Sequence, residues 1–396
     1  METMDSKTIM ELDEKYVLPT YGRNPVALVR GKGLRAWDAE GKEYLDFTSG
    51  IGVNGLGYCP DGWVEAVSRQ AATLQHTSNL YYTRPCAQLA QKLCQRTGLD
   101  KVFFANSGAE ANEGLIKAAR KYSADKYGEG RSTVVTFVNS FHGRTLATLT
   151  ATGQEVFHHY FGPFNDGFVY VPANDLETLK KACEEHPVCA LLMEMVQGEG
   201  GVTALEEGFV KEAAAYCAEK DILVLADEVQ TGIGRTGTFL ACEQYGLVPD
   251  GISLAKCLGG GLPLGAVVLG EKMAKGMGKG THGSTFGGNP VACAGANVVV
   301  DAISEEFLAQ VRRKAEILRA KLSALPHVKQ VSGLGLMIGL ELEEGIQAAD
   351  VLAKCQEKGL LVLTAKTRLR LLPGLILTEA EIDEAAGILE DVLKSF

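Results

Sequence analysis

The sequence predicts an α/β fold with a mostly parallel central sheet covered by helices. The first observation behind this prediction lies between about residues 100 and 270, where short, wholly apolar runs alternate with longer stretches of helical period. Strands that are apolar on both faces belong in a sheet that helices cover on both sides. The second observation is length, because 396 residues leave room for a large domain and a smaller one.

Six apolar runs are the predicted strands of the central sheet. The segments between them are long enough for the crossover helices that parallel strands require. The runs are KVFFAN (101–106), TVVTFV (133–138), CALLMEMV (189–196), DILVLADEV (221–229), GISLA (251–255) and AVVLG (266–270).

Two capping boxes predict helix starts. Ser107 and Glu110 have the S-x-x-E spacing in which each side chain bonds the other residue's backbone N–H, and Thr378 and Glu381 repeat it as T-x-x-E. An apolar stripe of helical period follows each box. The two stripes are Ala111, Leu115, Ala118, Ala119 and Tyr122, and Ile382, Ala385, Ala386, Leu389, Val392 and Leu393.

The character of the sequence changes near residues 60 and 290. Outside these limits apolar runs and helical periods are more mixed. We therefore expect a large domain over residues 60–290 and a smaller α+β domain built from residues 1–59 and 291–396.

Charge and hydropathy limit the partners of the chain. Its 39 basic and 49 acidic residues give a formal net charge of −10, whereas nucleic-acid-binding surfaces carry a positive field. No apolar run reaches the roughly 18 to 20 residues that span a bilayer, and the N-terminus resembles neither a secretory signal nor a transit peptide. We expect a cytoplasmic protein that binds neither nucleic acid nor membranes.

Two motif-like patterns are interpreted as chance. The ten cysteines form no CxxC pair, and the segment Cys183–Cys189, which includes His186, has no fourth ligand at zinc spacing. The stretch GKGTHG (278–283) matches the dinucleotide fingerprint but follows a helix-like stretch instead of a strand. The sequence therefore predicts reduced thiols, no metal site and no dinucleotide site.

Two charged residues end predicted strands. Asp227 follows the run DILVLA and Lys256 follows GISLA. Ligand crevices of open α/β sheets lie at the carboxyl ends of strands, and a charge there costs desolvation unless it is paired or takes part in chemistry. Taken singly, each also has a structural explanation, since Asp227 caps a turn equally well and the Lys256 side chain can extend to solvent.

Two further features belong to the same edge of the sheet. Ser107, Gly108 and Ala109 start a helix whose free N–H groups suit a phosphate, although a plain capping box also explains them. Phe141 and Arg144 follow the strand TVVTFV and add a ring and a cation. A lysine that forms an imine, an acid for a pyridinium nitrogen, a phosphate site and a stacking ring together describe a pyridoxal 5'-phosphate pocket.

Eight motifs run along the chain from Pro25 to the C-terminus. They are WDAEGKEYLDF (37–47), FFANSGAEANEGLIKAARKY (103–122), FHGRT (141–145), EMVQGEGG (194–201), LADEVQTGIGRTG (225–237), LAKCLGGGLPLGA (254–266), HGSTFGGNP (282–290) and RLLPGL (370–375). In this order they resemble the class III pyridoxal-phosphate-dependent aminotransferases, and within that family the branch that acts on acetylornithine.

The resemblance implies fold type I of the pyridoxal-phosphate-dependent transferases and assigns the cofactor contacts. Lys256 matches the Schiff-base lysine that later moves the substrate proton, and Asp227 matches the partner of the pyridine nitrogen. The other implied contacts are the phosphate cradle Ser107, Gly108 and Ala109, the ring faces at Val229 and Phe141, the phenolic oxygen at Gln230, and Thr285 at the neighbouring subunit's phosphate. A homodimer with shared active sites is therefore expected.

The resemblance also implies how substrates bind. Arg144 matches the arginine that holds the acetylornithine α-carboxylate, and Arg370 the one that holds the α-carboxylate of glutamate or 2-oxoglutarate. Glu199 matches an acid that pairs with the substrate-binding arginine and moves aside for the second substrate, and Ser284 touches the acetylornithine end. Arg368 shares a strand face with Arg370, and only the family spacing selects Arg370.

The implied reaction moves the δ-amino group of N2-acetyl-L-ornithine to 2-oxoglutarate, in arginine biosynthesis. Ornithine, succinylornithine, succinyldiaminopimelate and 4-aminobutyrate are alternative donors for the same pocket. An aminomutase or a decarboxylase uses the same cofactor, but Arg144 and Arg370 suit an exchange between two carboxylate substrates better. The non-enzyme alternative is a catalytically silent scaffold, against which the intact set of pocket residues argues. Gly374 and Cys257 depart from the residues frequent in the family.

Overall fold

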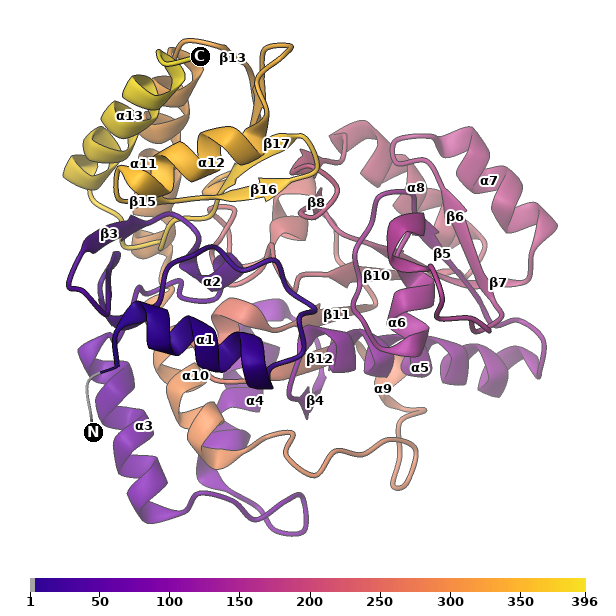
Figure 1. Ribbon diagram of the computed structural model, residues 1–396. Coiled ribbons are helices and arrows are strands. Elements are labelled where there is room, and N and C mark those ends of the chain that lie inside the picture. Colours follow the sequence, from indigo (N-terminus) through magenta and orange to yellow (C-terminus); the bar gives the residue numbers. More distant parts are fainter. Residues whose placement is uncertain (1–3) are drawn as a thin grey trace.

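The computed structural model describes residues 4–396, and its largest element is a seven-stranded sheet (Figure 1). Strand β12 runs antiparallel to both of its neighbours, and the four pairs among the other strands are parallel. The strand order is β4 (Lys101–Ala105), β12 (Gly265–Leu269), β11 (Gly251–Leu254), β10 (Leu223–Asp227), β7 (Val188–Met193), β5 (Thr133–Phe137) and β6 (Phe168–Val171). The predicted α/β fold with a mostly parallel sheet is confirmed.

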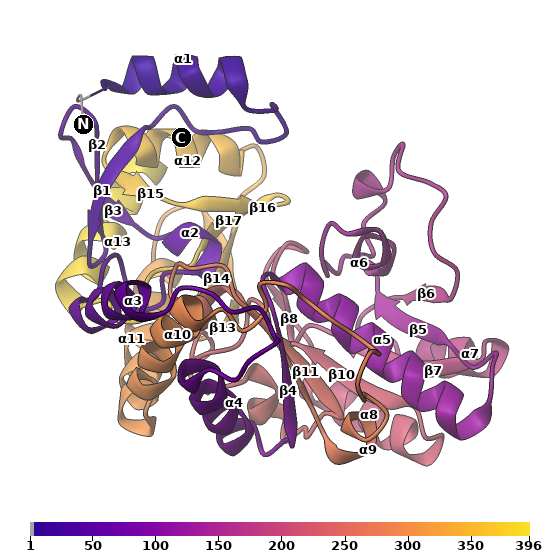
Figure 2. The same cartoon turned by 90° about the horizontal axis from the view of Figure 1, so that it is seen from below.

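Helices cover both faces of this sheet. Successive residues of β5 pack on opposite faces of the sheet. Val134 packs with helix α5 (Gly108–Tyr127), and Val135 packs into the apolar cluster on the other face. Helix α5 runs along the sheet in Figure 2. Burial on both faces explains why these strands are apolar throughout. The helices of the opposite face are α4 (Arg84–Thr97), α7 (Leu176–Glu185) and α8 (Glu207–Glu219).

Two details of the sheet differ from the prediction. The run 189–196 is divided, because β7 ends at Met193 and Val196 begins the short strand β8 (Val196–Gln197), which pairs with β9 (Thr203–Ala204). Strand β6 was absent from the predicted set. It is a short edge strand whose residues are mostly half-buried or exposed, although its sequence FVYV is as apolar as the central strands.

Both ends of the chain meet in a second, smaller region with two four-stranded sheets. Strand β15 pairs in parallel with β3, which joins the C-terminal third of the chain to the N-terminal segment. This agrees with a small domain made from both ends, and the limits at residues 60 and 290 stay predictions. The sheets are β1 (Leu28–Lys32), β2 (Arg35–Asp38), β3 (Glu43–Asp46) and β15 (Leu360–Leu361), and β13 (Val328–Leu334), β14 (Met337–Leu342), β17 (Arg368–Leu371) and β16 (Leu363–Ala365).

The two predicted capping boxes have different outcomes. Thr378 and Glu381 form the reciprocal box, and the six stripe residues that follow are all buried. Ser107 accepts from the Glu110 N–H (3.1 Å), but the Glu110 carboxylate accepts from the backbone N–H of Asn106 (2.6 Å) and not from that of Ser107. The capping box at Ser107 is therefore only half formed.

The remaining helices and turns connect these layers. They are α1 (Ser6–Tyr16), α2 (Ser49–Gly52), α3 (Asp61–Thr73), α6 (Leu146–Ala151), α9 (Glu271–Ala274), α10 (Pro290–Ala302), α11 (Glu305–Ser323), α12 (Ala348–Glu357), α13 (Glu379–Leu393), and the 3-10 turns η1 (Glu155–Phe157), η2 (Ala241–Tyr245) and η3 (Lys256–Gly259). Within residues 4–396, no helix combines the length and the apolar character needed to cross a bilayer, and no three His, Cys, Asp or Glu side chains cluster as a metal site.

Candidate active site

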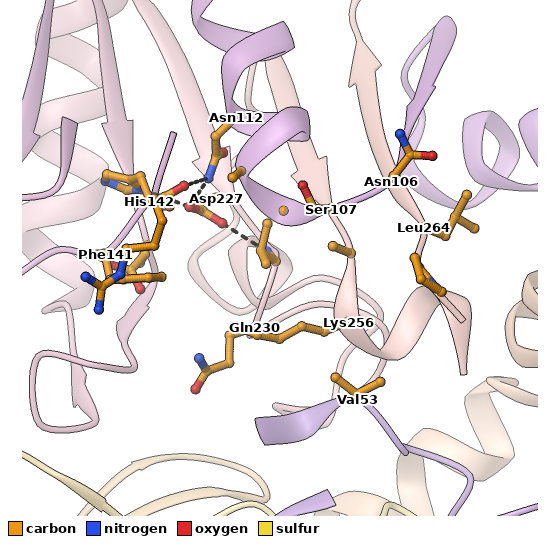
Figure 3. Close-up of a pocket in the computed structure, with 18 of the residues that line it drawn as sticks. Val53, Asn106, Ser107, Asn112, Phe141, His142, Asp227, Gln230, Lys256 and Leu264 are labelled. Carbon is orange, nitrogen blue, oxygen red and sulfur yellow. Dashed lines mark hydrogen bonds and ion pairs between the residues drawn. The ribbon is translucent and has the colours of Figure 1, made fainter. Parts of the chain in front are cut away.

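A cavity of about 440 Å³ lies at the carboxyl ends of the central strands (Figure 3). The segments that follow β5, β10 and β11 line it together with the start of α5. Parallel strands end at one edge of the sheet, so residues far apart in sequence meet there. Nine of the predicted site residues line this cavity: Ser107, Gly108, Ala109, Phe141, Arg144, Asp227, Val229, Gln230 and Lys256.

Lys256 comes two residues after the end of β11 and begins the turn η3. Its φ of 44° lies in the left-handed region, which is strained for a residue with a side chain. Burial lowers the pKa of the Lys256 amine, although the charges of Glu199 and Asp227 oppose this. A lysine with a lowered pKa is more often unprotonated near neutral pH, and is then a nucleophile or a base.

Asp227 is buried at the end of β10 and is held by three close donors. Its side chain accepts from Asn112 Nδ2 (2.7 Å), His142 Nδ1 (2.7 Å) and the backbone N–H of Val229 (3.0 Å). These three donors hold the carboxylate oxygens in one orientation. Asp227 therefore offers a fixed negative charge to a cationic group in the cavity.

Asn112 and His142 are site residues that sequence reasoning missed. Asn112 lies on the buried side of α5, one residue after Ala111, and a polar residue in an apolar stripe was the available signal. Burial lowers the pKa of His142, but its hydrogen bond to Asp227 and the charge of Asp227 outweigh burial and raise this pKa.

The start of α5 presents free backbone N–H groups beside the cavity. The first intrahelical bond runs from Ala111 N–H to Ser107 O (3.0 Å), so the earlier N–H groups of the helix point at no helical carbonyl. Such N–H groups, together with the helix dipole, bind phosphates. At Gly108 a Cβ atom would lie 2.5 Å from Val229 Cγ1, so only glycine permits this close approach.

Phe141 and Arg144 stand at another wall of the cavity. The Phe141 N–H donates to the buried carboxylate of Glu194 (2.9 Å), which fixes the backbone beside the ring. The Arg144 guanidinium lies over the Phe157 ring at 3.9 Å and over the Phe141 ring at 5.6 Å. Since Arg144 is exposed to the cavity, it is free to meet an anionic ligand.

Glu194 provides a pH-dependent test of this wall. Burial raises the pKa of Glu194 from 4.5 to about 7, so its ionised form is less stable in the folded than in the unfolded chain. Stability is therefore lost as the pH rises through this window. We expect the unfolding free energy of Glu194→Gln, relative to wild type, to rise by roughly 1 to 3 kcal/mol between pH 5 and 8, measured by denaturant unfolding at each pH.

The control is Glu129→Gln, at an exposed position. Its difference from wild type should stay constant over the same pH range. If the unfolding free energy of Glu194→Gln relative to wild type also stays constant from pH 5 to 8, the expected titration of Glu194 is contradicted.

Arg370 and Glu199 lie behind Gln230 and do not line the cavity. Arg370 Nη1 donates to Glu199 Oε1 (2.6 Å) and to Gln230 Oε1 (3.4 Å). Burial raises the pKa of Glu199, but the Arg370 charge and hydrogen bond outweigh it and hold the pKa below its usual value. Arg368 instead pairs with Glu341 (2.9 Å), so the structure separates two arginines that share a strand.

Ser284 and Thr285 also lie outside the cavity. Ser284 Oγ accepts from Asn106 Nδ2 (3.3 Å) and from the N–H of Gly287 (2.9 Å), which ties its loop to a residue that lines the cavity. Thr285 is exposed to solvent. Neither residue reaches the cavity of its own chain, and the predicted roles of both stay predictions.

Comparison with known proteins agrees with this geometry. A family model described as class-III aminotransferase matches residues 17–393. The chain belongs to the class III aminotransferase family. Its cavity, with a lysine, an aspartate and an anion site, lies where the family motifs predicted it.

The relatives are similar over almost their full length. The chain is 53% identical to the acetylornithine aminotransferase of Haemophilus ducreyi, over 98% of this chain and 99% of that protein. Among solved structures, the N-acetylornithine aminotransferase of Stenotrophomonas maltophilia has a TM-score of 0.85 at 36% identity, over 98% of this chain and 99% of that one. The ornithine aminotransferase of Toxoplasma gondii, which contains pyridoxal phosphate at its active site, has a TM-score of 0.95 at 31% identity, over 100% and 95% of the two chains.

The family depends on pyridoxal phosphate, and the cavity has the groups to hold it. Lys256 provides the amine for covalent attachment, and buried Asp227 provides an acceptor for a ring N–H. The start of α5 provides an anion site, where Gly108 leaves the space that a Cβ would fill. Three different chemical requirements are thus met inside one cavity.

Proposed function

We propose that this protein transfers the δ-amino group of N2-acetyl-L-ornithine to 2-oxoglutarate, giving N-acetyl-L-glutamate 5-semialdehyde and L-glutamate, as a step of arginine biosynthesis. The observation that carries the proposal is the arrangement of Lys256, Asp227 and Arg144 around one cavity, with Arg370 directly behind it. The donor is supported by eight relatives named acetylornithine aminotransferase, which are 41% to 53% identical to this chain.

The residues of the cavity divide the chemistry between them. When bound, pyridoxal phosphate supplies an electron sink for the electron pair left on the carbon that carries the amino group. Asp227, held by Asn112 and His142, would keep the ring nitrogen of the cofactor protonated. The Lys256 amine, whose pKa burial lowers, would hold the cofactor and move the proton of the δ-carbon of the donor.

The two arginines would bind the carboxylates of the two substrates. Arg144 carries its charge into the cavity, where it would bind the α-carboxylate of the donor with a planar, bidentate fork. Arg370 is neutralised by Glu199 in this structure. A dicarboxylate acceptor brings a carboxylate of its own and would replace Glu199 on Arg370, so the same cavity serves both half-reactions.

Steady-state kinetics tests the choice of donor. We expect kcat/KM for N-acetylornithine to exceed that for ornithine by at least about tenfold, because an uncharged acetamido group and a free ammonium group differ strongly in desolvation cost. Ornithine is the second candidate, since an ornithine aminotransferase shares this fold at a TM-score of 0.95. A preference for free ornithine would contradict the proposed donor, and failure with every amino donor would contradict the proposed enzyme.

We also propose a homodimer in which Thr285 of each chain completes the phosphate site of its partner. Support comes from the surface around that loop, where Phe286 is 61% exposed. The segment that carries the fully exposed Tyr82 is tied to the loop by Asn79, whose Nδ2 donates to the carbonyl oxygens of Ser284 (2.8 Å) and Gly287 (2.9 Å). Large exposed apolar side chains on one surface mark interaction sites. Light scattering should give a mass about twice the 42.3 kDa of the chain, and a monomer in solution would contradict this proposal.

The cytoplasm is the proposed location. All ten cysteines are free thiols in the structure, which is typical of proteins in a reducing compartment. We expect fractionated cells to contain the activity in the cytosolic fraction, and activity confined to another compartment would contradict it.

A further inference from the structure

Arg235 is a buried cation that the mechanism above does not use. It lies between β10 and η2, on the segment that also carries Val229 and Gln230, and only 1% of it is exposed. Burial lowers the pKa of its guanidinium to about 10, and no carboxylate in residues 4–396 pairs with it. Burying an unpaired cation in the core has a large desolvation cost, which other contacts of Arg235 must offset.

The hydrogen bonds of Arg235 lead to the smaller sheet region. Its Nη1 donates to the carbonyl oxygen of Leu336 at 3.2 Å and to that of Pro373. Its own carbonyl accepts from the Leu336 N–H at 3.0 Å. Nε and Nη2 find no partner in the described part of the chain. The side chain therefore binds two backbone oxygens and no acid.

The register of β14 and β17 explains why a side chain is needed there. Ile338 lies opposite Leu371 in this antiparallel pair, and continuing by two residues sets Leu336 opposite Pro373. Proline has no N–H, so it cannot donate to a facing strand. Arg235 supplies the missing donor and closes the end of the strand pair.

Arg370 belongs to the same strand pair. It lies opposite Gly339, three residues before Pro373, which is about 10 Å along a strand. The turn before β14 also packs closely on the Arg235 segment, because a Cβ at Gly335 would lie 2.5 Å from the backbone carbon of Thr236. This packing leaves Arg370 little freedom relative to the segment that carries Gln230.

We propose that Arg235 is a positioning residue for the acceptor substrate: it clamps the end of the β14–β17 pair and thereby places Arg370 beside Gln230. The inference rests on the proposed function, in which Arg370 binds the carboxylate of 2-oxoglutarate. Arg235 touches neither that carboxylate nor the cavity. Its loss therefore acts on one half-reaction and leaves Arg144, which binds the amino donor, in place.

The test measures the two half-reactions separately with the holoenzymes of Arg235→Met and Arg235→Lys. We expect the KM for 2-oxoglutarate to rise roughly 10- to 100-fold in Arg235→Met, because small misplacements of a binding group have effects of this size. The KM for the amino donor should change less than about threefold, as should the affinity for pyridoxal phosphate measured by equilibrium titration. In Arg235→Lys the KM for 2-oxoglutarate should also rise, but by a smaller factor, since one ammonium group replaces the planar guanidinium.

A rescue variant separates positioning from general damage. Pro373→Ala restores a backbone N–H opposite Leu336. Adding it to Arg235→Lys should therefore lower the raised KM for 2-oxoglutarate part of the way to the wild-type value. The matched control is Arg96→Lys, because Arg96 also bonds a backbone carbonyl, that of Ile303 (2.6 Å), away from Arg370. It should leave both KM values unchanged.

The outcomes distinguish the inference from the proposed function. A wild-type enzyme that does not use 2-oxoglutarate overturns the proposed function. An active wild type whose Arg235 variants lose both half-reactions equally, or neither, overturns the positioning role. If Arg235→Met does not fold, a selective rise in KM for Arg235→Lys still supports the inference, and an unselective one overturns it.

Discussion

Lys256→Ala should lower kcat by at least roughly 10⁴-fold, since it removes both the attachment of the cofactor and the base that moves the substrate proton. No other lysine lines the cavity within the described chain, so no neighbouring amine replaces it. Single-turnover transamination with pre-loaded cofactor measures the loss. The visible absorbance of the wild-type holoenzyme, which comes from the lysine-bound cofactor, should change in the variant.

The matched control is Lys272→Ala. Lys272 is a half-exposed lysine that pairs with Asp250 at 2.9 Å, away from the cavity. It should retain wild-type kcat. Retained activity in Lys256→Ala, or an equal loss in Lys272→Ala, would contradict the role of Lys256.

Asp227→Asn should lower kcat by roughly 10²- to 10³-fold, which is the usual effect of removing one preorganised electrostatic partner from an active site. The amide has nearly the same shape as the carboxylate but no charge with which to keep a ring nitrogen protonated. We also expect weaker pyridoxal phosphate binding, measured by equilibrium titration of the apoenzyme.

Two further variants show whether Asp227 acts through its charge. His142→Asn and Asn112→Ala each remove one donor to Asp227 and leave the carboxylate in place, so each should cost less than Asp227→Asn. Asp221→Asn is the surface control, since Asp221 pairs with Lys126 at 2.8 Å. An Asp227→Asn enzyme with full activity would contradict the proposed role.

The central sheet was predictable because its strands carry a local signal. Residues 133–137 and 223–227 are buried at every position, and burial on both faces makes them mostly apolar, which is visible in sequence. Strand β1 (LVRGK) carries no such run, because it is mostly exposed, and β6 is apolar but is a short strand at the edge of the sheet. Their pairing depends on neighbours distant in sequence.

The cavity was predictable for a related reason. Asp227 is the last residue of β10, and Lys256 comes two residues after the end of β11. Neighbouring parallel strands end at the same edge, so the positions of both residues follow from the strand assignments. The two side-chain donors to Asp227 did not follow, because Asn112 comes from the buried side of α5 and His142 from the segment after β5. They lie 115 and 85 residues from Asp227, and hydrogen bonds over such separations have no local pattern.

The sequence by itself determined the family, the order of the central strands along the chain and the residues that end them. The hydrophobic period and the motif spacing depend on residues that are close in sequence, so the sequence shows them directly. Only the tertiary structure decided what holds Asp227, that Arg368 pairs with Glu341, and that Arg235 closes a strand pair at Pro373. These outcomes depend on strand register and on contacts between distant segments. Tertiary packing determines both, whereas the spacing of residues in the sequence does not.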